Sequence, residues 1–504
     1  MTKESIESGI IKTPDECFLS LANFLKLPQN NRPLNIRNSD QPINEALFQD
    51  KPLYYIEKMG PVKDDIPVRV SYFQTDKGQR LELVYSYHVH LATNWYHAHV
   101  SALTGRVEGL NDWVADASYQ VFDINIADPN DGERTIISKN PDPVASPFGW
   151  HSNGKVSYLE TRGNNVWAQE NPDASDYFQW RYRPSGGSDL NFVFPFDTAL
   201  QPLKNKDAAV TQLFFANNEI HDILYKYGFD EASGNFQQKN ADRGGDGGDF
   251  VIADGLVRIG INNAYFGTPP DGKNGFMGMY LWDLTEPRRD GIFDIGIVIH
   301  EYGHGLSNRL TGGRTNSDCL PSGQSGGMGE GWSDVLAVVF RQKPTDKRTD
   351  SFEMGTYATG GVGIRNYPYS TRMTVNPSLF SFINKRGYEG VHAKGEVWAV
   401  ILLESYWNLV DTHGFTADLS SASISHGNTL FLHIIINGMK LQPCRPTFIK
   451  ARNAILQAEE AITGGENACQ FWRGFAKRGL GVDATLIRGK AINGYSVPEA
   501  CRNS

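Results

Sequence analysis

Two histidines one helical turn apart are the first residues of this chain that could do chemistry. His300 and His304 enclose Glu301 in the run His-Glu-Tyr-Gly-His. Positions i and i+4 of a helix lie one above the other, so both imidazoles can face one metal ion. Glu301 lies about 100° around the same helix, where its carboxylate can reach a metal-held water without ligating the metal. The spacing therefore predicts a catalytic zinc site whose general base is Glu301.

A second pair at the same spacing follows downstream. Glu330 is the fourth residue and Asp334 the last residue of the stretch Gly-Met-Gly-Glu-Gly-Trp-Ser-Asp, and an apolar run continues to residue 340. One of these carboxylates can supply the third metal ligand, while the other accepts the N–H of a ligating histidine and fixes its tautomer. Two histidines and one carboxylate leave a coordination position open for water, which is typical of a catalytic zinc site.

The elements that must position these residues can be predicted from hydrophobic periodicity. The apolar run 291–299 predicts a buried helix under the two histidines, and Gly312 with Gly313 provides a stop. Further helical patterns after residue 290 lie at 396–407, 429–436 and 448–461. Residues 117–290 instead alternate short apolar runs, such as 192–196 and 250–253, with turn signals; one helical pattern, 209–227, interrupts them. A β-rich half followed by a mainly helical half is expected. His221 and Asp222, inside 209–227, are expected to be buried rather than to bind metal.

The stretches His300–Gly313 and Gly327–Asp334 resemble the fungalysin family of secreted zinc metallopeptidases, which are similar to thermolysin. The resemblance implies an α+β fold of two lobes, with residues 117–290 and 291–504 flanking a cleft that holds the zinc. It implies one zinc ion per chain, with these roles: His300, His304 and Glu330 as ligands, Glu301 as base, and Asp334 as the partner of a ligating histidine.

Three further segments extend the resemblance to the substrate side. Residues 261–272 resemble the segment that becomes a substrate-pairing edge strand in thermolysin, which makes Asn263 and Ala264 candidate substrate contacts. Residues 363–370 point to Arg365 as a donor to a substrate carbonyl, and residues 391–396 point to His392 as the group that stabilises the tetrahedral intermediate.

One feature of thermolysin has no counterpart. A tyrosine there helps to hold the oxyanion, but residues 305–329 contain no tyrosine, so the role is unassigned. Tyr367 and Tyr369 lie near Arg365, and each is as compatible with core packing as with that role.

Residues 1–116 resemble, toward their end, a partial fungalysin propeptide of α+β structure, and Ala117 resembles the mature start. Strands are expected at 81–90 and 95–107, the second running into a Thr-Gly turn. We expect this region to inhibit its own enzyme in a latent zymogen. The first residues do not resemble a secretory signal. We therefore expect that the sequence is a truncated form of an exported protein; the alternative is that the protein is a cytosolic relative of the family. Four histidines alternate along the two strands without a Cys or an acidic residue to complete a ligand set, and a second metal site is not predicted there; they are His88, His90, His97 and His99.

Composition narrows the classes of function. The chain has 504 residues, a net charge of -9 and 21% charged residues. An acidic chain argues against nucleic acid as a partner, and no apolar stretch reaches about 18 residues, so no membrane partner is expected. Of five cysteines, four follow residue 116 and allow two disulfides in three pairings. Cys444 and Cys469 flank one predicted helix and are the preferred pair, with free thiols as the alternative. The acidic glycine-rich run 246–249 leaves calcium binding open.

Together these features predict a monomeric zinc endopeptidase that hydrolyses internal bonds of extracellular proteins or peptides. A zinc aminopeptidase is the first alternative, but it would need a glutamate cluster for the substrate amine, and the Gly-x-Met-Glu-Asn segment of one major such family is absent. A non-catalytic zinc-binding protein is the second, although the candidate base Glu301 is present.

Overall fold

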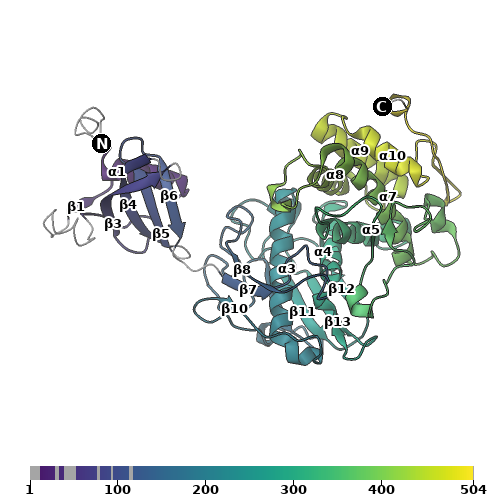
Figure 1. Cartoon of the computed structure of the whole chain (residues 1–504), viewed down its shortest axis with the longest axis horizontal. Helices are drawn as coiled ribbons and strands as arrows, with labels where there is room; N and C mark the ends of the chain where they lie inside the picture. The colour runs from purple at the N-terminus through teal and green to yellow at the C-terminus, as the bar shows by residue number, and fades with distance from the viewer. Residues whose placement is uncertain are drawn as a thin grey trace. The chain divides into compact units, whose positions relative to one another are not determined.

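The computed structural model describes residues 12–28, 33–38, 53–75, 80–91, 95–112 and 117–502. The chain divides into two compact units, residues 1–116 and 117–504, each with its own hydrophobic core (Figure 1). Helices and sheets are mixed, as an α+β fold requires. None of the helices in the described ranges is both long and apolar enough to cross a membrane.

In the described ranges, the first unit is an antiparallel sheet with helix α1 packed against it. Its strands pair in chain order: β1 (Ile36–Asn38), β2 (Tyr54–Ile56), β3 (Ile66–Thr75), β4 (Arg80–His90), β5 (Trp95–Ser101) and β6 (Val107–Asp112). Helix α1 (Pro14–Phe24) packs on the sheet, where the Tyr87 hydroxyl donates to the carbonyl of Pro14 at 2.6 Å. β4 confirms the strand predicted at 81–90, whereas the strand predicted at 95–107 ends at Ser101. The predicted Thr-Gly turn is confirmed, because Gly105 has a φ of +76° between β5 and β6.

The histidines of β4 and β5 form a cluster of rings. His88 pairs with His97 across the two strands, and their ring centroids lie 4.4 Å apart. His99 lies 4.4 Å from His97 and shares a hydrogen bond of 2.9 Å with the hydroxyl of Ser86. Burial, together with the neighbouring His97, lowers the pKa of His99 to about 4, so this ring is held in its neutral form.

The second unit begins with a β-rich portion around one long helix. Its main sheet has the order β12 (Ala264–Gly267), β13 (Phe276–Trp282), β11 (Val251–Val257) and β9 (Val166–Glu170), with β14 (Arg289–Asp290) paired to β13. A smaller sheet contains β10 (Asn191–Phe192), β7 (Ala117–Val121) and β8 (Thr135–Lys139). Helix α3 (Lys206–Lys226) contacts β7, β9 and β11 and confirms the predicted helix, with His221 and Asp222 buried in it. The strand predicted at 192–196 is wrong beyond Phe192, since Pro195 has no N–H to give a sheet.

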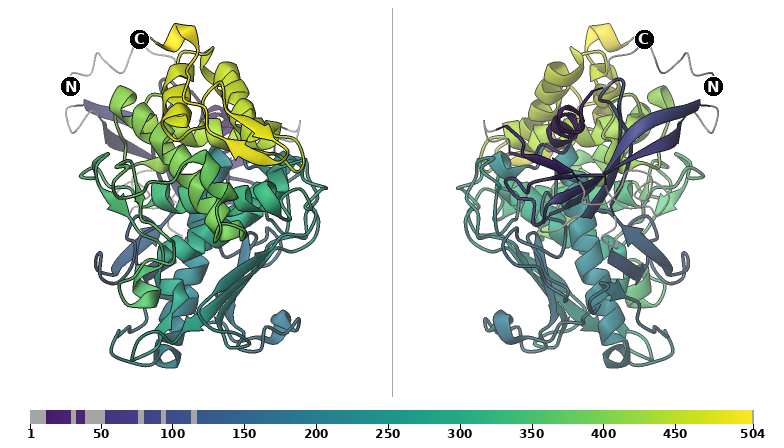
Figure 2. Two further views of the ribbon diagram at one scale, coloured as in Figure 1. Left: turned by 90° about the vertical axis from the view of Figure 1, so that its right-hand side faces the viewer. Right: turned by 90° about the vertical axis from the view of Figure 1, so that its left-hand side faces the viewer.

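Helices dominate after residue 290. They are α4 (Ile295–Leu310), α5 (Gly323–Phe340), α6 (Thr356–Thr359), α7 (Val391–His413), α8 (Gly427–Leu441), α9 (Phe448–Thr463) and α10 (Ala468–Lys477). Two short antiparallel strand pairs accompany them: β15 (Ser351–Phe352) with β16 (Tyr369–Ser370), and β17 (Thr485–Ile487) with β18 (Lys490–Ile492). Figure 2 shows α7 to α10 gathered at one end of this unit and the main sheet at the other. The predicted helices around the two motifs are confirmed.

Two glycines let the helices that carry the motifs approach each other closely. Helix α5 packs against both α4 and α7. A Cβ on Gly303 of α4 would lie 2.8 Å from the Cα of Ser333 on α5, and a Cβ on Gly395 of α7 would lie 2.5 Å from the Cβ of Glu330. Any side chain at either position would push α5 away, so the glycines determine how near the motif residues can come.

Two disulfides link the helical portion, and the preferred pairing was wrong. Cys319 bonds to Cys444, and Cys469 bonds to Cys501. Helix α9 lies between Cys444 and Cys469, and its 16 residues extend about 24 Å, far beyond the reach of a disulfide.

The acidic run 246–249 is neutralised by arginine. Arg309, fully buried on α4, lies 2.8 Å from a carboxylate oxygen of Asp249 and 3.2 Å from one of Asp271. Arg314 pairs with Asp246 and Asp271. Arg309 also donates to the carbonyls of Pro269 and Lys273, so it ties the loop after β12 to the histidine helix.

Arg309→Ala is expected to lower the free energy of unfolding by about 3–5 kcal/mol, because it leaves the buried carboxylate of Asp249 without its cation and leaves Asp271 with Arg314 alone. Arg314→Ala is the matched control: its side chain is 33% exposed, and a smaller loss is expected. Urea denaturation followed by tryptophan fluorescence measures both. Equal losses of unfolding free energy in the two variants would show that the buried ion pairs of Arg309 stabilise the fold no more than the partly exposed pairs of Arg314.

Candidate metal centre

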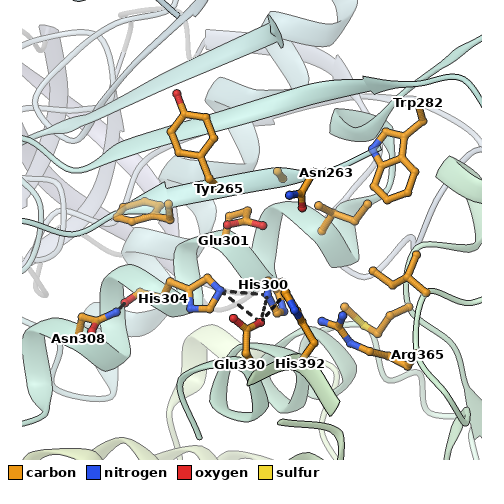
Figure 3. Close-up of a pocket in the computed structure, with 15 residues that line it drawn as sticks. Asn263, Tyr265, Trp282, His300, Glu301, His304, Asn308, Glu330, Arg365 and His392 are labelled. Carbon is orange, nitrogen blue, oxygen red and sulfur yellow. Dashed lines mark hydrogen bonds and ion pairs between the residues drawn. The ribbon is translucent and has the colours of Figure 1, made fainter. Parts of the chain in front are cut away.

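The candidate site forms where α4, α5 and α7 meet beside β12. Helix α4 supplies His300, Glu301 and His304, α5 supplies Glu330, and α7 supplies His392 (Figure 3). All five side chains line one cavity of about 320 Å³. The helical spacing that suggested His300 and His304 as a pair does bring their rings together, with centroids 4.7 Å apart.

Three potential ligand atoms converge in this cavity. The two Nε2 atoms of His300 and His304 lie 3.1 Å apart, and Oε2 of Glu330 lies 3.3 Å and 3.7 Å from them. A tetrahedral zinc ion with bonds of about 2.0–2.1 Å separates neighbouring ligand atoms by about 3.3–3.4 Å. The three separations therefore fit a zinc ion.

The state of Glu330 supports the same fit. Its Oε2 is buried and accepts no hydrogen bond from the described chain, an arrangement that would be costly without a cation to satisfy it. Although burial opposes ionisation, His300 and His304 lower the pKa of Glu330 to about 2. Within the described ranges, these are the only three His, Cys, Asp or Glu side chains close enough to share one ion.

Asp334 orients one of the histidines. Its Oδ1 lies 2.7 Å from Nδ1 of His300. A proton on Nδ1 donated to this carboxylate leaves the Nε2 lone pair directed into the cavity, as metal ligation requires. Asp334 is fully buried, yet Arg365 and His300 hold its pKa far below the usual range, so it is ionised.

Arg365 lines the cavity and donates two of its N–H groups to Asp334. Its Nε and Nη2 atoms donate to the two carboxylate oxygens at 2.7 and 2.8 Å. Tyr369 also donates its hydroxyl to Oδ2 of Asp334. Sequence reasoning found both residues near the site but missed this contact, because a loop residue some 30 positions from Asp334 gives no periodic signal.

Glu301 is buried in the cavity wall, and its carboxylate makes no hydrogen bond or ion pair with the rest of the described chain. Burial raises its pKa to about 7, with His300 acting in the opposite direction. In Figure 3, Glu301 lies on the β12 side of the site, whereas His392 lies beside Glu330. The carboxylate is therefore free to exchange a proton with a bound molecule.

His392 is the most solvent-accessible of these groups. Its side chain is 61% exposed, and its Nε2 lies 3.4 Å from Oε2 of Glu330. As the second residue of α7, it projects over the cavity from the side opposite the edge strand. An imidazole in this position can donate to a molecule bound in the cavity.

The edge strand β12 forms one wall of the cavity. It pairs antiparallel with β13 and is the terminal strand of the main sheet, so its other edge can accept an extended peptide. Asn263 and Ala264, predicted from the resemblance, both line the cavity. The remaining lining residues were not predicted: Tyr265, Phe266, Trp282, Ile297, Asn308, Met354 and Ile364. Asn308 had a helical signal, since it lies one turn beyond His304, as did Ile297, one turn before Glu301. Tyr265, Phe266 and Ile364 lie in segments that the resemblance had already pointed to.

Comparisons with known proteins agree with this geometry. Residues 118–484 match the profile of the family described as Fungalysin metallopeptidase (M36). The chain is 44% identical over 438 residues to Extracellular metalloproteinase 9 of Uncinocarpus reesii, which covers 86% of this chain and 68% of the relative. It is 44% identical over 457 residues to Extracellular metalloproteinase mep of Aspergillus fumigatus, covering 89% and 72%. The Coccidioides posadasii Extracellular metalloproteinase 9 is 45% identical over 429 residues, covering 84% and 67%.

Proposed function

Because this chain belongs to the fungalysin family and is an extracellular metalloendopeptidase, we propose that it cleaves internal peptide bonds with one zinc ion held by His300, His304 and Glu330. The observation that carries the proposal is the convergence of two imidazole nitrogens and one buried carboxylate oxygen at separations of 3.1, 3.3 and 3.7 Å. When bound, zinc would polarise the scissile carbonyl and acidify a water molecule.

The residues around the ligands would divide the proton chemistry. Glu301 takes a proton from the attacking water, holds it in the buried cavity, and passes it to the leaving nitrogen. His392 donates to the carbonyl oxygen as negative charge develops there. Asp334 keeps His300 in the tautomer that presents Nε2.

The substrate would lie along β12. Asn263 and Ala264 contact its backbone, as an added strand would. Arg365 contributes through Nη1, the guanidinium nitrogen for which the described chain provides no hydrogen-bond partner, and donates to a substrate carbonyl. The apolar walls formed by Trp282, Ile297 and Met354 would accept an apolar substrate side chain.

We also propose that residues 1–116 are a propeptide-like unit that inhibits the monomeric enzyme in a zymogen, and that residues 117–290 and 291–504 are the two lobes of a thermolysin-like peptidase. The compact unit ends at Asp116, two residues before the family match begins at residue 118, which supports this division.

Metal removal is the direct test of the zinc proposal. We expect the purified protein to contain one zinc ion per chain, and to lose cleavage of casein when a chelator removes it and regain cleavage when zinc alone is returned. Elemental analysis and a casein digest measure these quantities. Full cleavage by protein shown to be free of metal would refute the proposal.

A blocked peptide separates the two peptidase alternatives. A peptide acetylated at its N-terminus and amidated at its C-terminus offers no free amine, so an endopeptidase should cut it internally, as seen by mass spectrometry. Release of single residues only, and only from an unblocked version, would favour an aminopeptidase.

A further inference from the structure

The Asp334 carboxylate accepts more hydrogen bonds than are needed to orient one histidine. Its Oδ1 faces Nδ1 of His300 at 2.7 Å and Nη2 of Arg365 at 2.8 Å. Its Oδ2 accepts from Nε of Arg365 at 2.7 Å and from the hydroxyl of Tyr369. Asp334 is 0% exposed and Tyr369 is 1% exposed, so water contributes nothing to this arrangement.

The donors restrict the rotation of the carboxylate from both sides. Arg365 alone could pivot with Asp334, because a bidentate pair moves as one plane. Tyr369 approaches Oδ2 from a separate backbone position, held in the short β15–β16 pairing. With two independent donors on Oδ2, the direction of Oδ1 toward His300 is fixed.

The segment that carries both donors is itself anchored to α7. The backbone N–H and side-chain amide of Asn366 donate to the carboxylate of Glu396 at 3.1 and 3.2 Å. Glu396 lies one helical turn after His392, so a single loop connects the support of His300 with the helix that carries His392. This anchoring limits the movement of the segment that carries Tyr369.

We propose that Tyr369 is a positioning residue for the metal ligand His300, acting through Asp334, and that its hydroxyl raises the affinity of the site for zinc. Its hydroxyl is engaged by Asp334, so it does not serve as the oxyanion-holding tyrosine. This inference rests on the proposed function, because it assumes that zinc binds His300.

Tyr369→Phe tests the proposal, because it removes the hydroxyl and keeps the ring. The dissociation constant for zinc, measured by competition with a chromophoric chelator, is expected to rise about 10- to 100-fold. Tyr406→Phe is the matched control: Tyr406 is equally buried on α7, and its hydroxyl has no hydrogen-bond partner in the described chain. Its zinc affinity should equal that of the parent.

Repeating Tyr369→Phe in the Asp334→Ala variant distinguishes positioning of His300 from general destabilisation of the fold. In Asp334→Ala, the Tyr369 hydroxyl has no carboxylate to hold, so adding Tyr369→Phe should weaken zinc binding no further. Unchanged affinity in Tyr369→Phe, equal weakening in Tyr406→Phe, or additive loss in the Asp334→Ala background would each overturn the inference. Glu330→Ala serves as the independent check: if it too leaves zinc binding intact, the proposed metal site itself is wrong.

Discussion

Glu301→Gln is expected to keep its zinc and to lose peptide hydrolysis by about 10²- to 10⁴-fold, the range that a positioned general base contributes. Glutamine has the same shape as glutamate but cannot take a proton. Because no residue of the described chain depends on the Glu301 carboxylate for a hydrogen bond, the substitution should not disturb the fold. The single-turnover rate on a fluorogenic peptide and the zinc content per chain measure the two effects.

Glu460→Gln is the control for Glu301→Gln. Glu460 is exposed on α9, away from the cavity, so the same chemical change there should alter neither rate nor zinc content. Parent-like hydrolysis by Glu301→Gln would remove Glu301 from the mechanism. Loss of zinc by that variant would instead mean that Glu301 acts as a ligand.

Glu330→Ala is expected to abolish high-affinity zinc binding and to reduce hydrolysis to the level of chelator-treated parent protein. The substitution removes one of three ligands and leaves only the two histidines of α4 to hold the ion. Zinc should no longer raise the midpoint of thermal unfolding, because stabilisation by a ligand requires that the folded state bind it. Titration calorimetry with zinc and thermal scans with and without zinc provide the measurements.

The result for Glu330→Ala shows whether Glu330 binds the metal ion or only supports the fold. Without zinc, Glu330→Ala should fold as the metal-free parent does, since Oε2 of Glu330 accepts no hydrogen bond in the described chain. A variant that still binds zinc with parental affinity would exclude Glu330 from the metal centre.

Those parts of the fold that depend on the hydrophobic pattern within one short segment were predictable from the sequence. The helices at α4, α5, α7 and α9 follow from apolar periodicity, and the α3 prediction missed its start by only a few residues. The strand at 192–196 was wrong beyond Phe192 because Pro195 cannot donate to a sheet. The Cys444–Cys469 disulfide was wrong because proximity in sequence was taken as proximity in space. Cys319 and Cys444 are 125 positions apart, and no local pattern links them.

For the candidate site, the sequence alone determined which side chains could share a metal ion, because a helix places residues four apart on one face. His300 with His304, and Glu330 with Asp334, were apparent from that periodicity together with the family resemblance. Only the tertiary structure decided that Arg365 and Tyr369 both bond Asp334, and that Asn308, Trp282 and Met354 line the cavity. These contacts depend on how closely α4, α5 and α7 pack and on where loops cross them, and such distances are set by the balance of the whole core rather than by any short run of residues.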